Sequence, residues 1–299
     1  MKLAHRLEGT AALAAIALLR RLGPVGASNL CGWIARSIGP LLPVSKVAHR
    51  NLELAMPELD PVARRRIVRG VWDNLGRTAG ELVHTDRLGV TTSGPGWEYV
   101  GAEHLEALVA HRGPGMIFTG HIGNWEIMRT AMTSLGLVFA TLYRPSDNPI
   151  VDEIITDLRR LQPGSADLLF PKGAKGARQT LLHLRQGGRV VIVPDQKMND
   201  GIEARFFARP AMTASGLASL ALRTQCPVIP GYVQRVGPAR FRVTWEPPLP
   251  LPATGDRAAD VLALTQAVND RLEAWIRAAP ASWLWLHRRW PKECYADLR

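Results

Sequence analysis

Cysteine is scarce in this sequence, and its three cysteines lie far apart. Cys31, Cys226 and Cys294 show no CxxC spacing, which argues against a disulfide framework and a cysteine-based zinc site and favours a reducing compartment. Clusters of histidine and cysteine with the spacing of metal ligands are also absent. We therefore expect neither a metal nor a bound cofactor.

Several common catalytic motifs are missing as well. No GxSxG segment occurs, which argues against the nucleophile elbow of an α/β-hydrolase. The glycine- and lysine-rich segment 172–176 lacks the spacing of a phosphate-binding P-loop, and no GxGxxG follows an expected strand. Internal repeats, low-complexity tracts and long linkers are absent too. The sequence therefore indicates one α/β domain with a helical N-terminal segment, whose chemistry is not that of any of these common motifs.

Acidic residues are outnumbered by basic ones, 26 to 37, which leaves a formal net charge of +11. Such an excess favours an anionic partner: a nucleic acid, a membrane surface or a phosphorylated substrate. Aromatic residues make up only 6% of the chain, and the basic residues are scattered rather than interleaved with aromatics. We therefore expect a membrane surface and no nucleic acid.

The N-terminal region has no uncharged run long enough to be an obvious membrane span. Residues 9–19 form an uncharged stretch of 11 residues between charged flanks, and the stretch 22–35 is interrupted by Gly23 and Pro24. A spanning helix needs roughly 18 to 20 apolar residues. The Arg-flanked pattern predicts a helix that lies in or against a membrane surface, with an ordinary buried helix as the alternative.

Beyond this segment, short apolar runs bounded by Gly or Pro alternate with longer amphipathic stretches. We expect strands at residues 116–119, 138–142, 190–193, 228–233 and 240–245. We expect helices at residues 61–83, 103–111, 125–135, 149–161, 177–186, 213–224 and 259–278. This alternation predicts an α/β fold with a mostly parallel mixed sheet flanked by helices. Residues 1–45 are the expected membrane-associating helical segment, and residues 46–299 the catalytic domain.

The segment Thr119-Gly-His-Ile-Gly-Asn-Trp-Glu126 carries the strongest chemical signal. It follows an expected strand and opens an expected helix, which is a favoured site location in α/β sheets. With His121 in the Gly-flanked turn and Glu126 in the first helical turn, the carboxylate could fold back onto the imidazole. Such a pair is a general base with an orienting partner. The alternative is a packed histidine beside a helix-capping Asn124.

This segment and several later blocks together resemble a known enzyme family. The HxxxxE motif at His121 and Glu126 is similar to that of the bacterial lipid A late acyltransferases, the lauroyl and myristoyl transferases of the lysophospholipid acyltransferase superfamily. Five further blocks follow in the family's order and cover essentially the whole chain: Leu142–Pro145, Pro194–Gln196, Phe206–Thr213, Cys226–Pro230 and Trp283–Trp290. Ala208 departs from the usual glycine, and Ile192-Val193-Pro194 replaces the usual Leu-Leu before Asp-Gln.

The resemblance implies a glycerolipid acyltransferase-like fold and a specific reaction. A fatty acyl group would pass from acyl carrier protein to a hydroxyl of a lipid A precursor, at the cytoplasmic face of the cell inner membrane. His121 would activate the hydroxyl and Glu126 would orient His121. Related acyltransferases act on other glycolipids, such as phosphatidylinositol mannosides, or on lysophospholipids, and these remain alternatives. A catalytically silent lipid-binding relative is a further one.

The same blocks supply candidate substrate-binding residues, each with a structural alternative. Arg144 is a candidate phosphate contact, because guanidinium groups bind phosphate through two hydrogen bonds. Asp195 and Gln196 would bind substrate or brace the site, and Arg288 and Arg289 would neutralise lipid phosphates or form a solvated tail. The full set of candidates is Asn124, Tyr143, Arg144, Asp195, Gln196, Arg288 and Arg289. The tryptophans of the final block, Trp283, Trp285 and Trp290, are expected to pack in the core or at an interface.

Overall fold

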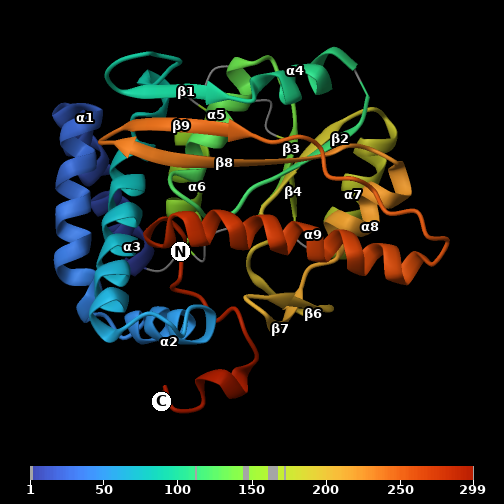
Figure 1. Ribbon diagram of the computed structural model, residues 1–299. Coiled ribbons are helices and arrows are strands. Elements are labelled where there is room, and N and C mark those ends of the chain that lie inside the picture. The colour runs from blue at the N-terminus through green and yellow to red at the C-terminus, as the bar shows by residue number, and fades with distance from the viewer. Residues whose placement is uncertain (1–2, 112, 144–147, 161–167, 172, 299) are drawn as a thin grey trace.

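The computed structural model of the chain describes residues 3–111, 113–143, 148–160, 168–171 and 173–298 (Figure 1). The α-helices of these ranges are α1 (Leu3–Ile38), α2 (Ser45–Ala55), α3 (Pro61–Leu82), α4 (Ala102–His111), α5 (Trp125–Ser134), α6 (Pro149–Arg160), α7 (Ala174–Arg185), α8 (Gly216–Thr224) and α9 (Arg257–Ala278). The strands are β1 (Gly96–Val100), β2 (Gly115–Phe118), β3 (Ala140–Tyr143), β4 (Leu168–Pro171), β5 (Arg189–Ile192), β6 (Lys197–Phe206), β7 (Arg209–Thr213), β8 (Val228–Gly237) and β9 (Arg240–Trp245). Short 3₁₀ turns lie at Gly39–Leu41, Thr85–Arg87, Pro280–Ser282 and Lys292–Tyr295.

Seven strands form one mixed sheet in the order β1-β9-β8-β2-β5-β3-β4. All neighbouring strands run parallel except β8 and β9, which form an antiparallel pair. Strands β6 and β7 pair separately as an antiparallel hairpin. The predicted α/β class with a mostly parallel mixed sheet is therefore confirmed.

The central strands alternate between two cores, one on each face of the sheet. In β2, Met116 and Phe118 face the core that includes α8, α9 and the C-terminal tryptophans, whereas Ile117 faces the core that includes α5. In β5, Val190 and Val191 divide in the same way. This double burial explains why these strands appear in the sequence as continuous apolar runs.

Four strands were not predicted. Strands β1 and β4 lie at the two edges of the sheet, and β4 is an apolar run of only four residues, Leu-Leu-Phe-Pro, whose side chains are exposed or half-buried. The hairpin β6–β7 is polar over much of its length, and β7 occupies the start of the stretch predicted as a helix from residue 213, which begins instead at Gly216 as α8. A polar hairpin has no hydrophobic periodicity to detect, and a four-residue apolar run is too short to show one.

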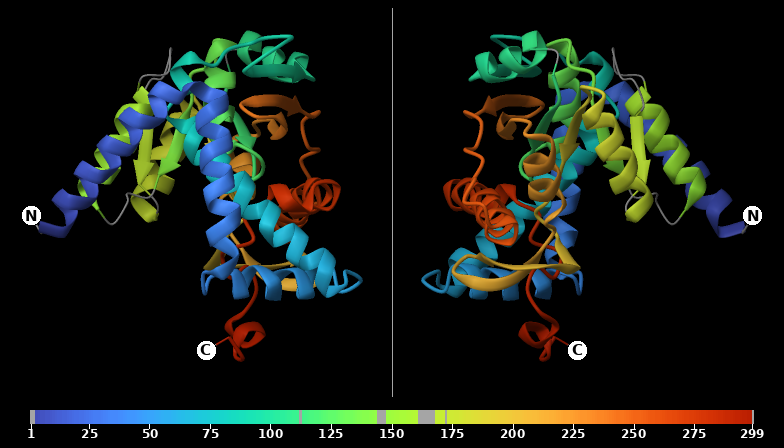
Figure 2. Two further views of the ribbon diagram at one scale, coloured as in Figure 1. Left: turned by 90° about the vertical axis from the view of Figure 1, so that its left-hand side faces the viewer. Right: turned by 90° about the vertical axis from the view of Figure 1, so that its right-hand side faces the viewer.

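The N-terminal helix α1 consists of two arms that meet at a kink. Gly23 adopts φ 69° and ψ 170°, and Pro24 follows it. Figure 2 shows the first arm leaving the body of the protein beside α6 and the second arm running back along α3. The pattern of charges predicted one short apolar helix there, whereas the observed helix is longer and bent. The Gly-Pro pair accounts for the bend.

The second arm of α1 packs very closely on α3. A Cβ atom at Gly76 would lie 2.3 Å from the carbonyl oxygen of Cys31, and one at Gly80 would lie 2.4 Å from that of Ala27. Ion pairs of α1 with the α3 region, Arg36 to Asp73 and Arg20 to Asp86, flank the contact. The two glycines therefore set the spacing of the two helices.

We predict that Gly76→Ala lowers the free energy of unfolding by about 1–3 kcal/mol, the usual cost of overpacking. The decrease should appear although alanine favours helices over glycine. Gly216→Ala is the matched control, because its Cβ would meet no atom within 4 Å. Chemical denaturation of both variants tests the prediction, and equal stability of the Gly76 variant and wild type would contradict it.

Candidate functional site

His121 lies in the turn between β2 and α5, at the carboxyl-end edge of the sheet. Gly123 makes this turn possible: its φ is +60°, and a Cβ atom there would lie 2.0 Å from the carbonyl oxygen of Val233. Asn124 then begins α5 as its N-cap, with its side-chain oxygen accepting a hydrogen bond from the amide of Glu126 at 3.2 Å. Strand, turn and cap together place the imidazole at the carboxyl end of the central strand β2.

The carboxylate of Asp195 holds His121 in this position. Asp195 follows β5, the parallel neighbour of β2, and is fully buried. One of its oxygens is 2.8 Å from Nδ1 of His121, and the other accepts hydrogen bonds from the His121 amide at 2.7 Å and from Nε1 of Trp283 at 2.8 Å. The backbone amide and the imidazole of His121 and the indole of Trp283 thus all bind the same carboxylate group.

These contacts keep Asp195 ionised. Burial by itself raises the pKa of the carboxyl group, but the charge of His121 and its hydrogen bonds outweigh burial and hold the pKa well below its usual range. An ionised carboxylate only accepts hydrogen bonds, so Nδ1 of His121 carries a proton toward Asp195. Nε2 is then the ring nitrogen with a lone pair that can take a proton.

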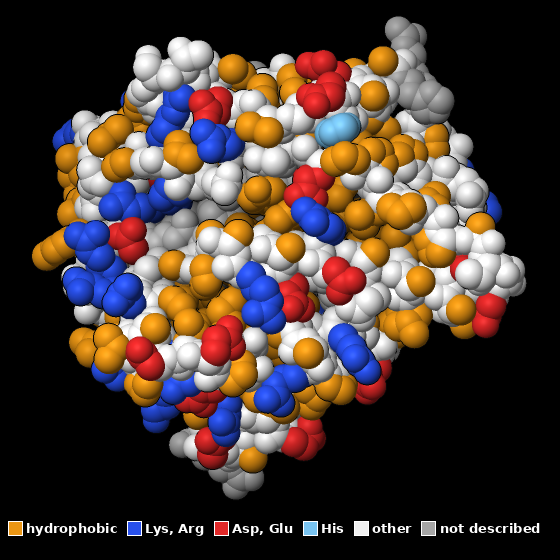
Figure 3. All heavy atoms as spheres, viewed as in Figure 1, with side chains coloured by type: hydrophobic (Ala, Val, Ile, Leu, Met, Phe, Trp, Pro, Cys, Tyr) orange, Lys and Arg blue, Asp and Glu red, His pale blue; other side chains and the backbone are white. Residues whose placement is uncertain are grey.

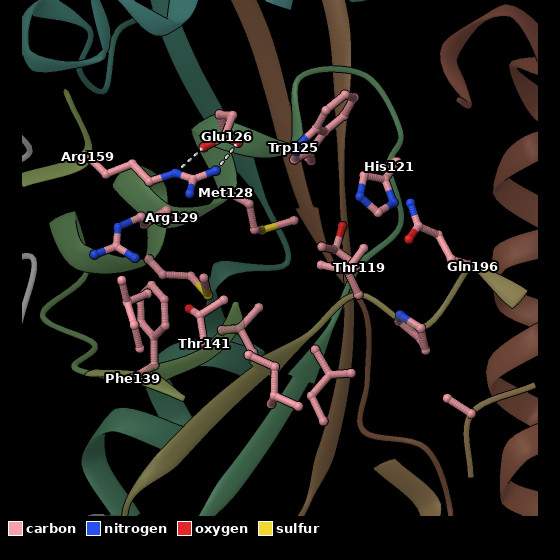
Figure 4. A pocket seen from close by; sticks show the side chains of 18 of the residues that line it. Thr119, His121, Trp125, Glu126, Met128, Arg129, Phe139, Thr141, Arg159 and Gln196 are labelled. Carbon is pink, nitrogen blue, oxygen red and sulfur yellow. Dashed lines mark hydrogen bonds and ion pairs between the residues drawn. The ribbon is translucent and has the colours of Figure 1, made fainter. Parts of the chain in front are cut away.

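Glu126 makes a different contact from the one expected from the sequence. Its carboxylate accepts two hydrogen bonds from the guanidinium of Arg159 on α6, at 2.7 and 3.1 Å. Figure 4 shows this ion pair and His121 on either side of Trp125, whose ring lies edge-on to the imidazole with centroids 5.2 Å apart. The carboxylate on Nδ1 of His121 is that of Asp195, so the contact with the imidazole that was expected of Glu126 is made by Asp195.

A pocket of about 420 Å³ opens beside these groups. His121, Glu126, Arg159 and Gln196 line it together with a larger set of apolar side chains, as Figure 4 shows. The apolar part of its lining includes Met128, Met132, Phe139, Leu142, Leu169, Val191 and Ile192. Arg129, which lies over the ring of Phe139, and Lys197 also line the pocket. The pocket is therefore mainly apolar, with the imidazole of His121 and the Glu126–Arg159 ion pair on one side of it.

The other binding candidates fall into different places. Gln196 lines the pocket, as its position next to Asp195 suggested. Asn124 is fully buried and both ends of its amide are hydrogen-bonded within the protein, so its role is that of a helix cap rather than a substrate contact. Tyr143 ends β3, and Arg144 lies outside the described residues.

The two arginines of the final block have separate environments. Arg289 is fully buried, donates to the Met212 carbonyl and the Thr213 hydroxyl, and lies over the ring of Phe206. The expectation that it neutralises lipid phosphates is therefore corrected: it braces the core, because a buried guanidinium cannot reach a lipid headgroup. Arg288 is exposed and lies over the ring of Tyr295.

Trp283 and Arg159 were not identified as parts of the site from the sequence, and Asp195 was left open between substrate binding and bracing. The prediction that Trp283, Trp285 and Trp290 pack in the core is confirmed. Asp195 follows a buried strand, as His121 does, and this pattern could have suggested that both lie at the same end of the sheet. The sequence does not show, however, that their two strands are neighbours. Among the described residues, no group of three or more His, Cys, Asp or Glu could hold a metal ion.

The histidine of the final block leads to a prediction about acid stability. His287 is largely buried, its ring nitrogens have no hydrogen-bond partner among the described residues, and burial lowers its pKa. Its usual pKa is about 6.5, so on acidification the unfolded chain takes up a proton before the folded protein does, and the free energy of unfolding decreases. The Asp195 contribution, in contrast, is present above the usual pKa of aspartate and is lost only at much lower pH.

We predict that His287→Phe reduces the loss of stability between pH 7.5 and pH 5.5. Part of the loss should remain, because burial also lowers the pKa of His49 and His84. Denaturant titrations across this pH range measure the effect, and substitution of the partly exposed His104 by Gln serves as the control. An unchanged pH dependence in the His287 variant would remove this group from the acid response.

The chain is similar in sequence to known acyltransferases. The chain is 26% identical to the lipid A biosynthesis lauroyltransferase of Escherichia coli (strain K12) over 263 residues, 82% of this chain and 78% of the relative. It is 26% identical to a phosphatidylinositol mannoside acyltransferase of Mycobacterium tuberculosis (strain CDC 1551 / Oshkosh) over 193 residues, 64% of this chain and 58% of the relative.

A third relative is the lipid A biosynthesis acyltransferase of Haemophilus influenzae (strain ATCC 51907 / DSM 11121 / KW20 / Rd). It is 24% identical over 196 residues, which are 63% of this chain and 57% of that protein. A model of the bacterial lipid A biosynthesis acyltransferase family matches residues 4–292, nearly the whole chain. The protein is a member of the bacterial lipid A biosynthesis acyltransferase family.

Proposed function

We propose that this enzyme transfers a fatty acyl group from acyl carrier protein to a hydroxyl group of a lipid A precursor. The observation that carries the proposal is the buried Asp195 carboxylate on Nδ1 of His121, at the polar end of an apolar pocket. Family membership supports acyl transfer to a lipid. The identity of the donor rests on the family resemblance of the sequence motifs.

The arrangement around His121 suits activation of a substrate hydroxyl. Nε2 takes the proton of the acceptor hydroxyl, and the oxygen attacks the carbonyl carbon of the thioester. The tetrahedral intermediate then collapses, the carbon–sulfur bond breaks, and the thiolate leaves with the proton from the imidazolium. Asp195 stabilises the imidazolium while it carries this proton.

Side chains are better placed than the backbone amides of the turn to stabilise the oxyanion of the tetrahedral intermediate. The amides of His121, Gly123 and Glu126 already donate to Asp195, the Ser282 carbonyl and Asn124 respectively. The carboxamide of Gln196 lies beside the imidazole at the rim of the pocket (Figure 4). We assign Gln196 to stabilisation of the developing negative charge.

The rest of the pocket suits an acyl chain. Its apolar wall, which includes Met132 and Phe139, buries hydrocarbon favourably. The ion pair of Glu126 and Arg159 stands at the polar end. Glu126 keeps its proposed catalytic importance in this arrangement, because it holds the Arg159 guanidinium at the place where polar substrate groups enter.

The acceptor has a specific alternative. The match to a phosphatidylinositol mannoside acyltransferase, at the same identity as the match to the lauroyltransferase, favours a mannosylated phosphoinositide as the second candidate. Both acceptors offer a sugar hydroxyl and a phosphate. Supplying each acceptor separately with the same acyl-carrier-protein donor distinguishes them.

We predict that His121→Ala and Asp195→Asn each lower kcat by about 10²- to 10⁴-fold, the usual contribution of a general base and its orienting carboxylate. Their double variant should be little worse than His121→Ala alone, because groups that act as one unit are not additive. Glu126→Gln should also lower the rate, since it removes the charge paired with Arg159. The measurement is acyl transfer monitored by mass spectrometry of the acceptor.

Asp260→Asn is the control for loss of a buried carboxylate. Asp260 is also buried, but it accepts hydrogen bonds from the amide and hydroxyl of Thr254 at the start of α9 and is not part of the pocket lining. It should retain near wild-type kcat. A folded His121→Ala protein with near wild-type transfer would refute the mechanism.

We further propose that the enzyme works at a membrane surface, on the cytoplasmic face of the inner membrane. By length and composition, residues 8–41 could cross a membrane, and they are little buried in the protein. The second arm of α1 is nevertheless docked on α3 through the ion pair of Arg36 with Asp73, and the end of the first arm is tied to the segment after α3 through the Leu19 carbonyl and His84. A helix bound along one side to a polar domain is better suited to lie in the membrane surface than to span it.

The exposed side of this arm is apolar. Trp33 and Ile38 are 56% and 54% exposed, and Leu41, in the 3₁₀ turn that follows the arm, is 82% exposed. Figure 3 shows lysine and arginine side chains beside apolar ones along the edge where α1 and α3 lie. Apolar groups flanked by basic ones are the combination that binds anionic membranes.

We predict that Trp33→Asp with Ile38→Asp weakens binding to vesicles of phosphatidylethanolamine and phosphatidylglycerol by at least about tenfold, because buried apolar area and charge attraction are both lost. Leu182→Asp on α7, where the side chain is equally exposed at 56%, should bind as wild type does. Vesicle flotation measures the binding. Equal flotation of all three proteins would rule out this face of α1 as the membrane contact.

A further inference from the structure

A second buried carboxylate lies behind the catalytic turn. Glu81, near the end of α3, is fully buried and accepts hydrogen bonds from four residues that are far from it in the sequence. Oε1 accepts from the Ser28 hydroxyl of α1 at 2.7 Å, from the Ala239 amide at 3.1 Å and from Nη1 of Arg235. Oε2 accepts from Nδ2 of Asn124 at 2.8 Å. A carboxylate satisfied in this way has one defined orientation.

The contact with Asn124 determines how the helix cap is oriented. An ionised carboxylate only accepts hydrogen bonds, so the NH₂ end of the Asn124 amide must face Glu81. The oxygen end then faces α5 and accepts from the Glu126 amide. Glu81 thus selects the one amide orientation in which Asn124 can cap the helix that follows His121.

The same side of α3 also holds the backbone of the turn. Nδ2 of Asn74 donates to the Gly123 carbonyl at 2.9 Å. The Thr78 hydroxyl lies 3.3 Å from the same carbonyl and 2.9 Å from the Asn74 carbonyl, and its single hydrogen is shared between these two acceptors. Arg235 in turn donates to Asn74 at 3.2 Å and to Thr78 at 3.1 Å. The Arg235 guanidinium therefore neutralises Glu81 and fixes Asn74 and Thr78, the two side chains next to the Gly123 carbonyl.

We propose that Glu81, with Arg235 as its counter-ion, is a positioning residue for His121 that acts through Asn124 and Gly123. It has no contact with substrate in this role, which rests on the proposed catalytic function of His121. The physical basis is the sensitivity of proton transfer to geometry: a displacement of about 1 Å can cost about 10²-fold in rate. A turn held only by its own strand and helix would tolerate such displacements.

A reversal of hydrogen-bond polarity tests this proposal. In Glu81→Gln, an NH₂ group faces the NH₂ group of Asn124; in Asn124→Asp, two carboxylates face each other. Combining the two substitutions restores one donor and one acceptor, keeps the net charge, and leaves an aspartate that is a good N-cap. Oxygen Oε1 of the new glutamine still accepts from Arg235, Ser28 and Ala239.

The matched control is Ser28→Ala. It removes a hydrogen bond from the same carboxylate, on the side that faces α1 rather than the turn. The measurements are kcat, KM for the acyl donor, and hydrogen–deuterium exchange of the amides of residues 121–127 in the full-length protein. The exchange experiment needs no substrate and reports on the turn whatever reaction the enzyme catalyses.

We expect each single substitution to lower kcat at least about tenfold with KM within about threefold of wild type, and to increase exchange in residues 121–127. The double variant should recover kcat to within about threefold of wild type and recover protection from exchange. Ser28→Ala should leave both unchanged. If Glu81→Gln yields no folded protein, the double variant decides alone: recovery of fold and kcat supports the proposal, and recovery of fold without kcat overturns it.

Other outcomes separate this proposal from the function on which it rests. A folded Glu81→Gln protein with wild-type kcat and wild-type exchange overturns the positioning role, while an inactive His121→Ala protein still supports the catalytic one. If His121→Ala retains activity but Glu81→Gln increases exchange at 121–127, the catalytic assignment fails and the positioning claim for kcat fails with it. A double variant as slow as the slower single also overturns the positioning role.

Discussion

The carboxylate of Asp195 is the constraint around which the site is organised. It is fully buried, so its charge must be compensated, and the compensation comes from His121 twice and from Trp283 once. Each partner belongs to a different part of the chain. The backbone near them adds further ties, since the Leu284 amide donates to the His121 carbonyl and the Gly123 amide donates to Ser282. The C-terminal segment thereby holds the turn that carries His121.

Two blocks that are far apart in the sequence form one packed unit behind this turn. The ring of Phe206 lies 5.7 Å from that of Trp283, and the Arg289 guanidinium lies over Phe206 while it bonds Thr213. The hairpin β6–β7 and the C-terminal tryptophan segment are therefore parts of the same core. Their function is to hold Trp283 where its indole N–H reaches Asp195.

The helix α6 connects the N-terminal arm of α1 with the polar end of the pocket. Asn148, just before α6, bonds Glu8 of that arm at 2.6 Å, and Gly9 packs closely on Ile150. About two and a half helical turns after Ile150, the chain has reached the end of α6, where Arg159 pairs with Glu126. The part of the chain that we assign to the membrane is thus in direct packing contact with the helix that brings Arg159 to the pocket.

The sequence by itself determined the class of the fold, the central strands, and the turn that carries His121, because buried parallel strands and capped helices leave strong local patterns. Only the tertiary structure decided which carboxylate holds His121. Glu126 is five residues from His121 and Asp195 is 74 residues away, yet the pairing of β2 with β5 brings Asp195 to the imidazole while α6 brings Arg159 to Glu126. Local spacing reports what is near along the chain, whereas strand order sets what is near in space. The burial of Arg289 and the bond of Trp283 to Asp195 have the same origin, because both depend on where the last residues of the chain pack.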